Sequence, residues 1–515
     1  MIPVLSREAM RRFDARAIEA GVPGIILMEN AGRGAAEMVR ENLKAPSAVV
    51  VVVCGTGNNG GDGFVLARQL RAFGVEPRAV LVGDVERIAG DARIAYDAYL
   101  AIGGTVEVAP TDLDATDLRA VLLDADVVVD ALFGTGLDRP LAGLLAEAAE
   151  GITQSKGFRV ALDVPSGIQA DTGVALGPSV TADLTVTFAF TKLGLMTPRG
   201  RAHAGLVRTV SIGVPCELPR DIAAAAELVE RSDVASWLSP RGADAHKYTA
   251  GHVAVLGGSH GKFGAPLLAA EAALLAGAGA VTLLSWPEVV QKLEGRVREV
   301  MVATAFGDAT TDVNAISAAL DGKKAVVLGP GLGLDDRARA LADAVLSSYL
   351  GPLVLDADGL TLFAGRVDAI AAGVQRARVL TPHAAEAARL LGGTAQSVEA
   401  DRVGAARSLA HRSQSIVVLK GAHSVIADPD GRILLGPIGS PALATAGSGD
   451  VLSGAVGAML AIMPPLEAAA AAVYLHAEAG HRLASVVGDR GVLASAVARE
   501  LPLILGELLR ERRRG

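Results

Sequence analysis

The chain has 515 residues, of which 51% are hydrophobic and 20% are charged, and its formal net charge is −8. This length exceeds what one ordinary core supports and predicts two domains, while the composition excludes a disordered chain. The acidic balance provides no basic field for gathering nucleic acid, so small molecules are the expected partners.

The chain opens with residues 1–21, which predict an amphipathic helix because they lack the apolar core and the cleavage site of a signal peptide. The two cysteines, Cys54 and Cys216, do not have the spacing of a disulfide framework or a zinc site. We therefore expect a protein of the reducing cytoplasm.

Short apolar runs follow from residue 48, namely AVVVVVC, RAVLVG, DVVVDALFG, FRVALDVPSG and ADLTVTFAF. Segments of helical length separate these runs. Unbroken apolar runs are typical of strands buried on both faces, so this half predicts an α/β fold with a parallel sheet covered by helices. Ligands of such folds gather at the carboxyl ends of the strands.

The first run leads into GTGNNGGDG, which contains the spacing G-x-G-x-x-G. We expect a loop here and a helix from about Phe64, whose N-terminal N–H groups would suit phosphate oxygens. The spacing alone is a weak signal, and Asp84 after the next run leaves a dinucleotide-dependent oxidoreductase open. Asn58, Asn59 and Asp62 go beyond that fingerprint and predict a polar ligand, with a hard cation as an option.

Two further strand ends carry Asp130, in VVVDALFGTGLDRPL, and Asp163 with Ser166, in VALDVPSG. A single aspartate at such a place is commonly a helix cap or a turn former, but several polar strand ends beside glycine turns favour a site. Lys192, in TFAFTKLGL, is open between a contact to substrate phosphate and an ordinary solvated lysine.

A second set of strands begins after residues 220–235, where we place the domain boundary. Its apolar runs are GHVAVLGG, GAVTLLS, KAVVLGPGLG, GPLVLDADGL, ARVLTPH and SIVVLKGAHSVI. Two longer apolar stretches, from Ala265 and from Gly454, are interrupted by Glu271 and by Pro464. They therefore predict buried helices rather than membrane spans.

Further along, ATAGSGDVLSGAVGAML predicts a glycine loop that enters a helix, with Asp450 in the first turn. Backbone N–H groups of residues 447–449 can stabilise an anion while Asp450 accepts a proton from an attacking hydroxyl, which suits phosphoryl transfer. A capped helix start without a ligand is the alternative. Lys420 offers a compact charge for phosphate, and His383, after Pro382, could donate to a substrate or cap a helix.

The motifs NNGGDG, DALFGTGL and DVPSG together resemble the N-terminal domain of the NAD(P)H-hydrate epimerases, across residues 5–215. The resemblance implies a Rossmann-like three-layer domain, which we assign to residues 1–225, and a potassium ion held by Asn59, Asp130 and Ser166. We expect Asp163 to be the general base or acid, because a carboxylate beside a cation can be tuned for proton transfer. The residues implied to bind the hydrated nucleotide are Asn58, Asn59, Gly60, Gly61, Asp62, Gly134, Thr135, Gly136, Leu137, Asp138, Arg139, Pro140 and Asp163.

The second set of motifs, among them GPGLG, LDADGL, LTPHAAEAARLL, VVLKGAHSVI and GSGD, resembles the ribokinase-like NAD(P)H-hydrate dehydratases over residues 232–510. We assign this ribokinase-like α/β domain to residues 226–515. The resemblance implies that the hydrated nucleotide binds at Ala265, Gly331, His383 and Asp450. It implies that ADP or AMP binds at Lys420, Gly421, Ala422, His423, Ser424 and Gly449. Two positions depart from the family pattern, Phe263 in place of tyrosine and Ala496 in place of aspartate.

Together the resemblances imply a bifunctional enzyme of metabolite repair. Its N-terminal domain would interconvert the R and S forms of hydrated NADH or NADPH. Its C-terminal domain would dehydrate the S form with ADP, giving AMP and phosphate, after Asp450 removes the proton of the ring hydroxyl and that oxygen is phosphorylated. Mg²⁺ is expected to bridge the nucleotide phosphates.

We expect small-molecule partners only, no nucleic acid, no membrane, and a homo-oligomer. The alternative function is a ribokinase-like small-molecule kinase fused to a non-catalytic nucleotide-binding module.

Overall fold

Two compact units make up the computed structural model, which describes residues 1–515 except 46, 216, 218, 220, 243, 245, 248, 249, 305–312, 372–376 and 513–515. One unit holds residues 3–226, and the other holds residues 227–515 together with the first two residues. Cys54 is a buried free thiol, whereas Cys216 lies outside the described residues.

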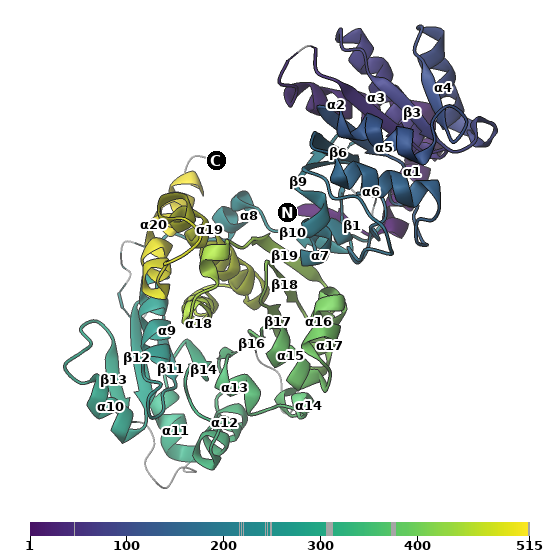
Figure 1. Ribbon diagram of the computed structural model, residues 1–515. Coiled ribbons are helices and arrows are strands. Elements are labelled where there is room, and N and C mark those ends of the chain that lie inside the picture. The colour runs from purple at the N-terminus through teal and green to yellow at the C-terminus, as the bar shows by residue number, and fades with distance from the viewer. Residues whose placement is uncertain are drawn as a thin grey trace. The chain divides into compact units, whose positions relative to one another are not determined.

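A parallel sheet forms the centre of the N-terminal unit, with the order β4-β3-β2-β5-β6-β7-β9 (Figure 1). These strands are β2 (Val50–Cys54), β3 (Arg78–Val82), β4 (Val106–Ala109), β5 (Val127–Ala131), β6 (Phe158–Leu162), β7 (Leu184–Phe188) and β9 (Leu206–Val210). A short parallel pair joins β1 (Ile2–Leu5) to β8 (Thr191–Lys192). The strand order reverses between β2 and β5, and open α/β sheets bind ligands at such a switch point.

Helices cover both faces of this sheet, and successive residues of β2 show it. Val50, Val52 and Cys54 belong to one apolar core, while Val51 and Val53 belong to another. The helices are α1 (Arg7–Glu19), α2 (Gly24–Glu41), α3 (Asn58–Ala72), α4 (Gly90–Ala101), α5 (Ala115–Leu123), α6 (Leu144–Gln154) and α7 (Pro198–Ala204). Burial on both faces explains the unbroken apolar runs, and the three-layer Rossmann-like fold is confirmed.

The C-terminal unit has a second sheet with the order β13-β12-β11-β14-β15-β16-β17-β18-β19-β10. Its strands are β10 (Ala226–Leu228), β11 (His252–Leu256), β12 (Ala280–Ser285), β13 (Met301–Thr304), β14 (Ala325–Leu328), β15 (Leu353–Leu355), β16 (Arg378–Leu380), β17 (Ile416–Leu419), β18 (His423–Ala427) and β19 (Ile433–Ile438). The pairs from β13 to β17 are parallel, and β18 is antiparallel to both of its neighbours. This is a ribokinase-like α/β fold, as expected, and its strand order reverses between β11 and β14.

Four long helices, α9 (Gly264–Leu275), α18 (Ser448–Leu460), α19 (Pro465–Val487) and α20 (Ala494–Arg512), pack together in this unit (Figure 1). A Cβ on Gly454 of α18 would lie only 2.0 Å from the carbonyl oxygen of Ala269 in α9, so glycine is required for this contact. None of the helices in the described ranges has the length and the apolar character that crossing a membrane requires.

The C-terminal unit has further helices in its described ranges. They are α8 (Arg231–Trp237), α10 (Pro287–Leu293), α11 (Val313–Leu320), α12 (Asp336–Ser348), α13 (Asp358–Thr361), α14 (Val367–Ala371), α15 (Ala384–Leu391), α16 (Ala395–Ala400) and α17 (Arg402–Ser413).

Candidate active sites

A cavity of about 520 Å³ opens at the carboxyl ends of β2, β5 and β6 in the N-terminal unit. Residues of the segments 57–62 and 132–136 line it together with Asp163, and side chains of α1 and α2 complete the wall. Because β2 and β5 flank the switch point, the cavity lies where this class of fold binds its ligands. The structure therefore brings together the polar strand ends that the sequence singled out.

The glycine-rich segment before the cavity is helical. Gly57 is the N-cap of α3 and Asn58 is its first residue, so NNGGDG forms the first turns of that helix. The expectation of a loop with a helix from about Phe64 is therefore wrong. Glycine has a poor helix propensity, but tertiary packing overrides that preference here.

Glycines of α3 allow approaches that a side chain would block. A Cβ on Gly60 would lie 1.8 Å from the carbonyl oxygen of Gly55, and a Cβ on Gly63 would lie 2.6 Å from the Cβ of Ala131. Neither Gly60 nor Gly61 lines the cavity. These glycines hold α3 directly against the strand ends, so they position the polar residues beside them.

The polar residues of this segment, in contrast, line the cavity. The Asn59 side chain is 8% exposed, and its Nδ2 has no hydrogen-bond partner among the described residues. Asp62 lies one turn further along α3. Burial first, and then the charge of Asp163, raise the pKa of Asp62 well above its ordinary value. Burial of Asp62 therefore favours the protonated form of its carboxyl group relative to an exposed aspartate.

The loop after β5 contributes only part of the expected set. Three of its residues line the cavity, Gly134, Thr135 and Gly136. The other four lie outside the wall, Leu137, Asp138, Arg139 and Pro140. Leu137 is buried in an apolar core, and the exposed carboxylate of Asp138 lies 3.6 Å from Nη2 of Arg7.

Asp163 and Lys192 form an ion pair in the cavity wall, with 2.5 Å between Oδ1 and Nζ. Asp163 has φ 65°, a left-handed conformation that non-glycine residues adopt rarely, and its Oδ2 accepts a hydrogen bond from the backbone N–H of Thr135. Lys192 Nζ also donates to Thr187 Oγ1 and to the carbonyl oxygen of Phe188.

The Lys192 side chain is 1% exposed, so the solvated-lysine alternative is wrong. An ammonium group has three N–H donors, and here all three have acceptors. The arrangement therefore favours a lysine that holds Asp163 over one that binds substrate phosphate.

Asp130 and Ser166 form a buried cluster of oxygen atoms behind the cavity. Ser166 Oγ lies 2.6 Å from Asp130 Oδ1 and 3.1 Å from the carbonyl oxygen of Phe133. Burial raises the pKa of Asp130 to about 6, against the opposing hydrogen bonds from Ser166. No cationic side chain pairs with Asp130 among the described residues, so the buried oxygens of Asp130 and Ser166 fit a monovalent cation.

Three of the residues expected in the second site follow strands of the C-terminal unit. Gly331 follows β14, His383 follows β16 and Lys420 follows β17. Lys420 Nζ lies 2.8 Å from Oδ1 of Asp356, which follows β15, and 3.8 Å from Oε2 of Glu386. Burial opposes the charge of Lys420, but Asp356 and Glu386 outweigh it and raise the pKa of Lys420.

Asp450 lies in the first turn of α18, close to this ion pair. Gly447, with φ 88°, caps the helix, and a Cβ on Gly449 would lie 3.4 Å from Lys420 Nζ. Burial first, and then the charge of Asp356, raise the pKa of Asp450 to about 7. A proton acceptor, an ammonium group and a helix N-terminus therefore meet at one place, which is the combination that phosphoryl transfer requires.

His383 caps α15, as one of its two interpretations predicts. Its Nδ1 accepts hydrogen bonds from the backbone N–H groups of Ala385 and Glu386, and the Glu386 carboxylate accepts one from the backbone N–H of His383. In this neutral tautomer the proton is on Nε2, which lies 3.4 Å from Oε1 of Glu386. A cap at Nδ1 leaves Nε2 able to donate to a ligand.

The segment 420–424 offers its backbone more than its side chains. Gly421 is exposed, whereas His423 is buried, with Nδ1 3.0 Å from the carbonyl oxygen of Gly436. Arg402 Nη2 donates to the carbonyl oxygens of Leu419 and Lys420 and so fixes this turn from below. Ala422 is exposed and Ser424 is half-buried.

Ala265 and the two departures from the family pattern lie at helix starts. A Cβ on Gly331 would lie 3.4 Å from the Cβ of Ala265, so these residues are neighbours. Phe263 is the N-cap of α9, and the guanidinium of Arg296 lies over its ring. Ala496 lies in the first turn of α20.

Sequence reasoning missed four residues of these sites. Asp356, Glu386 and Arg402 surround Lys420, and the signal for Asp356 was its position at a strand end in LDADGL. Asp14 lines the N-terminal cavity from α1. No motif marks Asp14, because nothing in a single amphipathic helix tells which of its polar residues meets a distant cavity.

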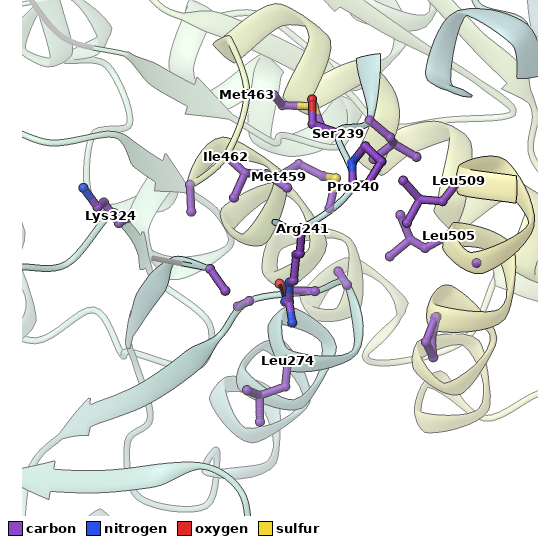
Figure 2. A pocket seen from close by; sticks show the side chains of 18 of the residues that line it. Ser239, Pro240, Arg241, Leu274, Lys324, Met459, Ile462, Met463, Leu505 and Leu509 are labelled. Carbon is purple, nitrogen blue, oxygen red and sulfur yellow. Dashed lines mark hydrogen bonds between the residues drawn. The ribbon is translucent and has the colours of Figure 1, made fainter. Parts of the chain in front are cut away.

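A separate cavity of about 1140 Å³ lies in the C-terminal unit (Figure 2). Figure 2 shows the side chains of Met459, Ile462 and Leu505 in its wall, and Lys324 at its side. Lys324 precedes β14, so this cavity lies at the amino ends of the strands. None of the expected site residues lines it, and the carboxyl ends remain the place for the chemistry.

Two family models match the chain. A model described as NAD(P)H-hydrate dehydratase matches residues 253–503, and one described as YjeF-related protein N-terminus matches residues 24–194. In the described ranges, no three or more His, Cys, Asp or Glu side chains form a group able to hold a metal ion.

The chain is similar over nearly its whole length to curated proteins named bifunctional NAD(P)H-hydrate repair enzyme Nnr. The protein of Moorella thermoacetica is 38% identical, with 95% of this chain and 94% of that protein covered. The protein of Thermanaerovibrio acidaminovorans is 41% identical, with 97% and 98% covered. A solved structure, the ADP/ATP-dependent NAD(P)H-hydrate dehydratase from Bacillus subtilis co-crystallised with ATP and Mg²⁺, is 29% identical with a TM-score of 0.49, covering 55% of this chain and 99% of that one.

Proposed function

The chain belongs to the family of bifunctional NAD(P)H-hydrate repair enzymes, with an epimerase and a dehydratase domain, and from this premise we propose how its residues divide the work. The unit assigned to residues 1–225 interconverts the R and S forms of hydrated NADH and NADPH. The unit assigned to residues 226–515 returns the S form to NADH or NADPH at the expense of ADP.

Dehydration begins at the ring hydroxyl of the S form. Asp450 removes the hydroxyl proton, the oxygen attacks the terminal phosphorus of ADP, and AMP leaves. The ester then departs as phosphate, with the ring nitrogen supplying electrons, and loss of a neighbouring C–H proton restores the double bond. Phosphorylation is needed because hydroxide is a poor leaving group and phosphate is a good one.

The observation that carries this proposal is the position of Asp450. Its carboxyl has a pKa of about 7 and lies at the helix N-terminus beside Lys420. Lys420 and the N–H groups near Gly449 can therefore neutralise the transferred phosphoryl group while Asp450 takes the proton. Backbone of residues 421–424 completes the nucleotide site, and His383 Nε2–H donates to the hydrated nucleotide.

In the epimerase, the hydrated ring lies in the 520 Å³ cavity against Asp163. The ion pair with Lys192 and the hydrogen bond from Thr135 hold the carboxylate of Asp163 in place beside the ring, where it can accept a proton. Asn58, Asn59 and Asp62 line the same wall and provide the polar contacts to the nucleotide.

Two cations complete the proposal. The oxygen cluster of Asn59, Asp130 and Ser166 suits potassium, which would supply the positive charge that the buried Asp130 lacks. Magnesium, held mainly by the nucleotide phosphates, would supply charge neutralisation for phosphoryl transfer.

The proposal is tested by incubating the chain with hydrated NADH, separately with ADP and with ATP, and with and without potassium. Recovery of the absorbance of reduced nicotinamide reports dehydration, and chromatography of the R and S forms reports epimerisation. We expect complete recovery with ADP and loss of R-form consumption in Asp163→Asn. A stable phosphorylated product without recovery would instead indicate the fused-kinase alternative. A homo-oligomer, measured by light scattering, and a cytoplasmic location stay predictions.

A further inference from the structure

Asp14, a carboxylate that no sequence motif marks, faces the N-terminal cavity. Asp14 of α1 lines the cavity together with Asp62, Asp163 and Lys192. We infer that Asp14 is a second proton-transfer residue of the epimerase site, which serves one face of the hydrated ring while Asp163 serves the other. This inference rests on the epimerase function proposed above.

The position of Asp14 is fixed by the packing of its helix. Ser6 caps α1 with a side-chain hydrogen bond of 3.1 Å. Phe13, the neighbour of Asp14 in the chain, is buried and meets the ring of Phe190 edge-on, with 5.0 Å between the ring centroids. Phe190 lies two residues before Lys192, so α1 is anchored beside the segment that carries the lysine. The carboxylate of Asp14 is therefore held at the cavity wall.

Asp14 has no partner that would explain it as a structural residue. Within the part of the chain that the structure describes, its carboxylate makes no hydrogen bond and no ion pair, although buried polar groups are normally bonded. Lys192, the cation whose charge acts on Asp14, uses its three donors on Asp163, Thr187 and Phe188. Asp14 is thus a partly buried carboxyl group that faces a cavity and is free to exchange a proton.

The electrostatic surroundings suit this role. The other charged groups of the cavity wall are Arg11, Asp62, Asp91, Asp163 and Lys192. Burial raises the pKa of Asp14 to about 6, the charge of Lys192 lowers it, and the charge of Asp163 raises it. A carboxyl group that titrates close to neutral pH can serve as an acid in one direction of a reaction and as a base in the other.

Epimerisation needs such a group because the two forms differ at one carbon. Hydration places the hydroxyl on the ring carbon beside nitrogen, where the nitrogen lone pair stabilises positive charge. When the C–O bond breaks, its electron pair leaves on oxygen, a carboxyl group gives that oxygen a proton, and water departs as C=N⁺ forms.

Water then forms the new C–O bond on the opposite face, the C=N pair returns to nitrogen, and a carboxylate on that face takes the released proton. No oxidant, reductant or co-reactant is required. One carboxyl has gained the proton that the other has lost, so the pair is left ready for the reverse direction.

Asp163 alone is badly placed for both steps. Its oxygens are fixed by Lys192, by the N–H of Thr135 and by the hydroxyl of Thr187, which lies 3.4 Å from Oδ1. A carboxylate held in this way reaches one face of a bound ring. Asp14 approaches the same cavity from α1, a different element, and can reach the other face.

The test compares the full-length Asp14→Asn and Asp14→Glu variants, using the purified R form of hydrated NADPH without ADP. We expect Asp14→Asn to lower the kcat of epimerisation by about 100-fold with little change in KM, since general acid–base catalysis is worth this much. One limb of the wild-type pH profile of kcat should disappear in Asp14→Asn and return, displaced, in Asp14→Glu. ADP-dependent dehydration of the S form, measured on the same samples, should remain at the wild-type rate.

Glu19→Gln is the matched control, because Glu19 is an exposed carboxylate of the same helix that pairs with Arg16. It should leave both activities unchanged. The inference is overturned if Asp14→Asn keeps its kcat, if it changes KM alone, or if the pH profile keeps both limbs. If Asp14→Asn does not fold, the pH profile of Asp14→Glu tests the inference instead: a displaced limb supports it, and an unchanged limb overturns it. Absence of epimerisation in the wild type would instead contradict the proposed function itself.

Discussion

The two units place the same ion pair, a lysine with a strand-end aspartate, beside a carboxyl group of raised pKa, but they treat the lysine differently. The Lys192 side chain is 1% exposed, and its N–H donors all contact acceptors of the protein. The Lys420 side chain, in contrast, is 19% exposed and lies beside the start of α18. A fully buried lysine can act only through the aspartate with which it forms an ion pair. An accessible one at a helix N-terminus can also bind an incoming anion.

The largest expected effect concerns Asp450, the carboxyl group of the C-terminal site. Asp450→Asn should lower ADP-dependent dehydration by about 1000-fold, because it removes the proton acceptor. Wild-type kcat should fall as pH decreases below about 7, since protonated Asp450 cannot accept a proton. The rate of absorbance recovery over a pH series checks both statements, with epimerisation on the same chain as the control.

The same variant should be more stable than wild type at alkaline pH. The pKa of Asp450 rises from 3.8 to about 7 on folding, so the folded state binds this proton more tightly than the unfolded state does. Stability from this group is therefore present at acid pH and is lost as pH rises toward 7. Calorimetry at about pH 8 should show a higher Tm for Asp450→Asn, and an unchanged Tm would contradict the raised pKa.

The two lysines should differ in what they contribute to stability. Lys192→Met removes the cation that pairs with the buried Asp163 and should cost about 3 kcal/mol. Lys420→Met should cost about 1 kcal/mol, because the Lys420 side chain is 19% exposed and the buried Asp356 keeps its hydrogen bond from Thr381. Equal losses in the free energy of unfolding, measured by chemical denaturation, would contradict the distinction between a buried and an accessible lysine.

Glycine substitutions test whether α3 is held by packing. Gly60→Ala should destabilise the N-terminal unit by about 2 kcal/mol, because its Cβ would overlap the carbonyl oxygen of Gly55. Gly57→Ser is the matched control, since a Cβ there meets nothing within 4 Å and serine is a good N-cap. Thermal unfolding should separate the two variants. Equal Tm values of the two variants would contradict the conclusion that the packing of Gly60 holds this helix in place.

The smallest expected effect concerns His383 in the C-terminal site. Asn is a good helix cap, so His383→Asn should keep the free energy of unfolding while removing the Nε2–H donor. We expect a rise of about fivefold in KM for the hydrated nucleotide, equivalent to one hydrogen bond. His383→Ala should lose the cap as well, so a difference in stability between the two variants separates capping from binding.

Much of this organisation could be predicted from the sequence because the strands are continuous apolar runs. Asp130 and Asp163 end neighbouring parallel strands, so a shared sheet edge brings them together. Lys420 and His383 likewise follow neighbouring strands, and a β-bridge joins them. Polar residues that follow buried parallel strands are therefore the part of a site that the pattern predicts well.

What could not be predicted depends on tertiary packing. The helical start at Asn58 contradicts glycine propensity, and it is explained by the close packing of Gly60 against Gly55 and of Gly63 against Ala131. Lys192 ends a short strand, but its burial follows from the groups that enclose it. Asp14 lies about 150 residues before Asp163 in the chain, and no local pattern links the two positions.

The left-handed backbone of Asp163 has a consequence for engineering. A residue with a Cβ at φ 65° is strained by about 1 kcal/mol, although aspartate and asparagine tolerate this conformation better than other residues do. Replacing this aspartate would relieve the strain but would leave Lys192, which is 1% exposed, buried without its counter-charge, and that loss outweighs the gain. Selection for heat resistance would therefore act on another left-handed position, such as Gln414 with φ 49°, before it acts on Asp163.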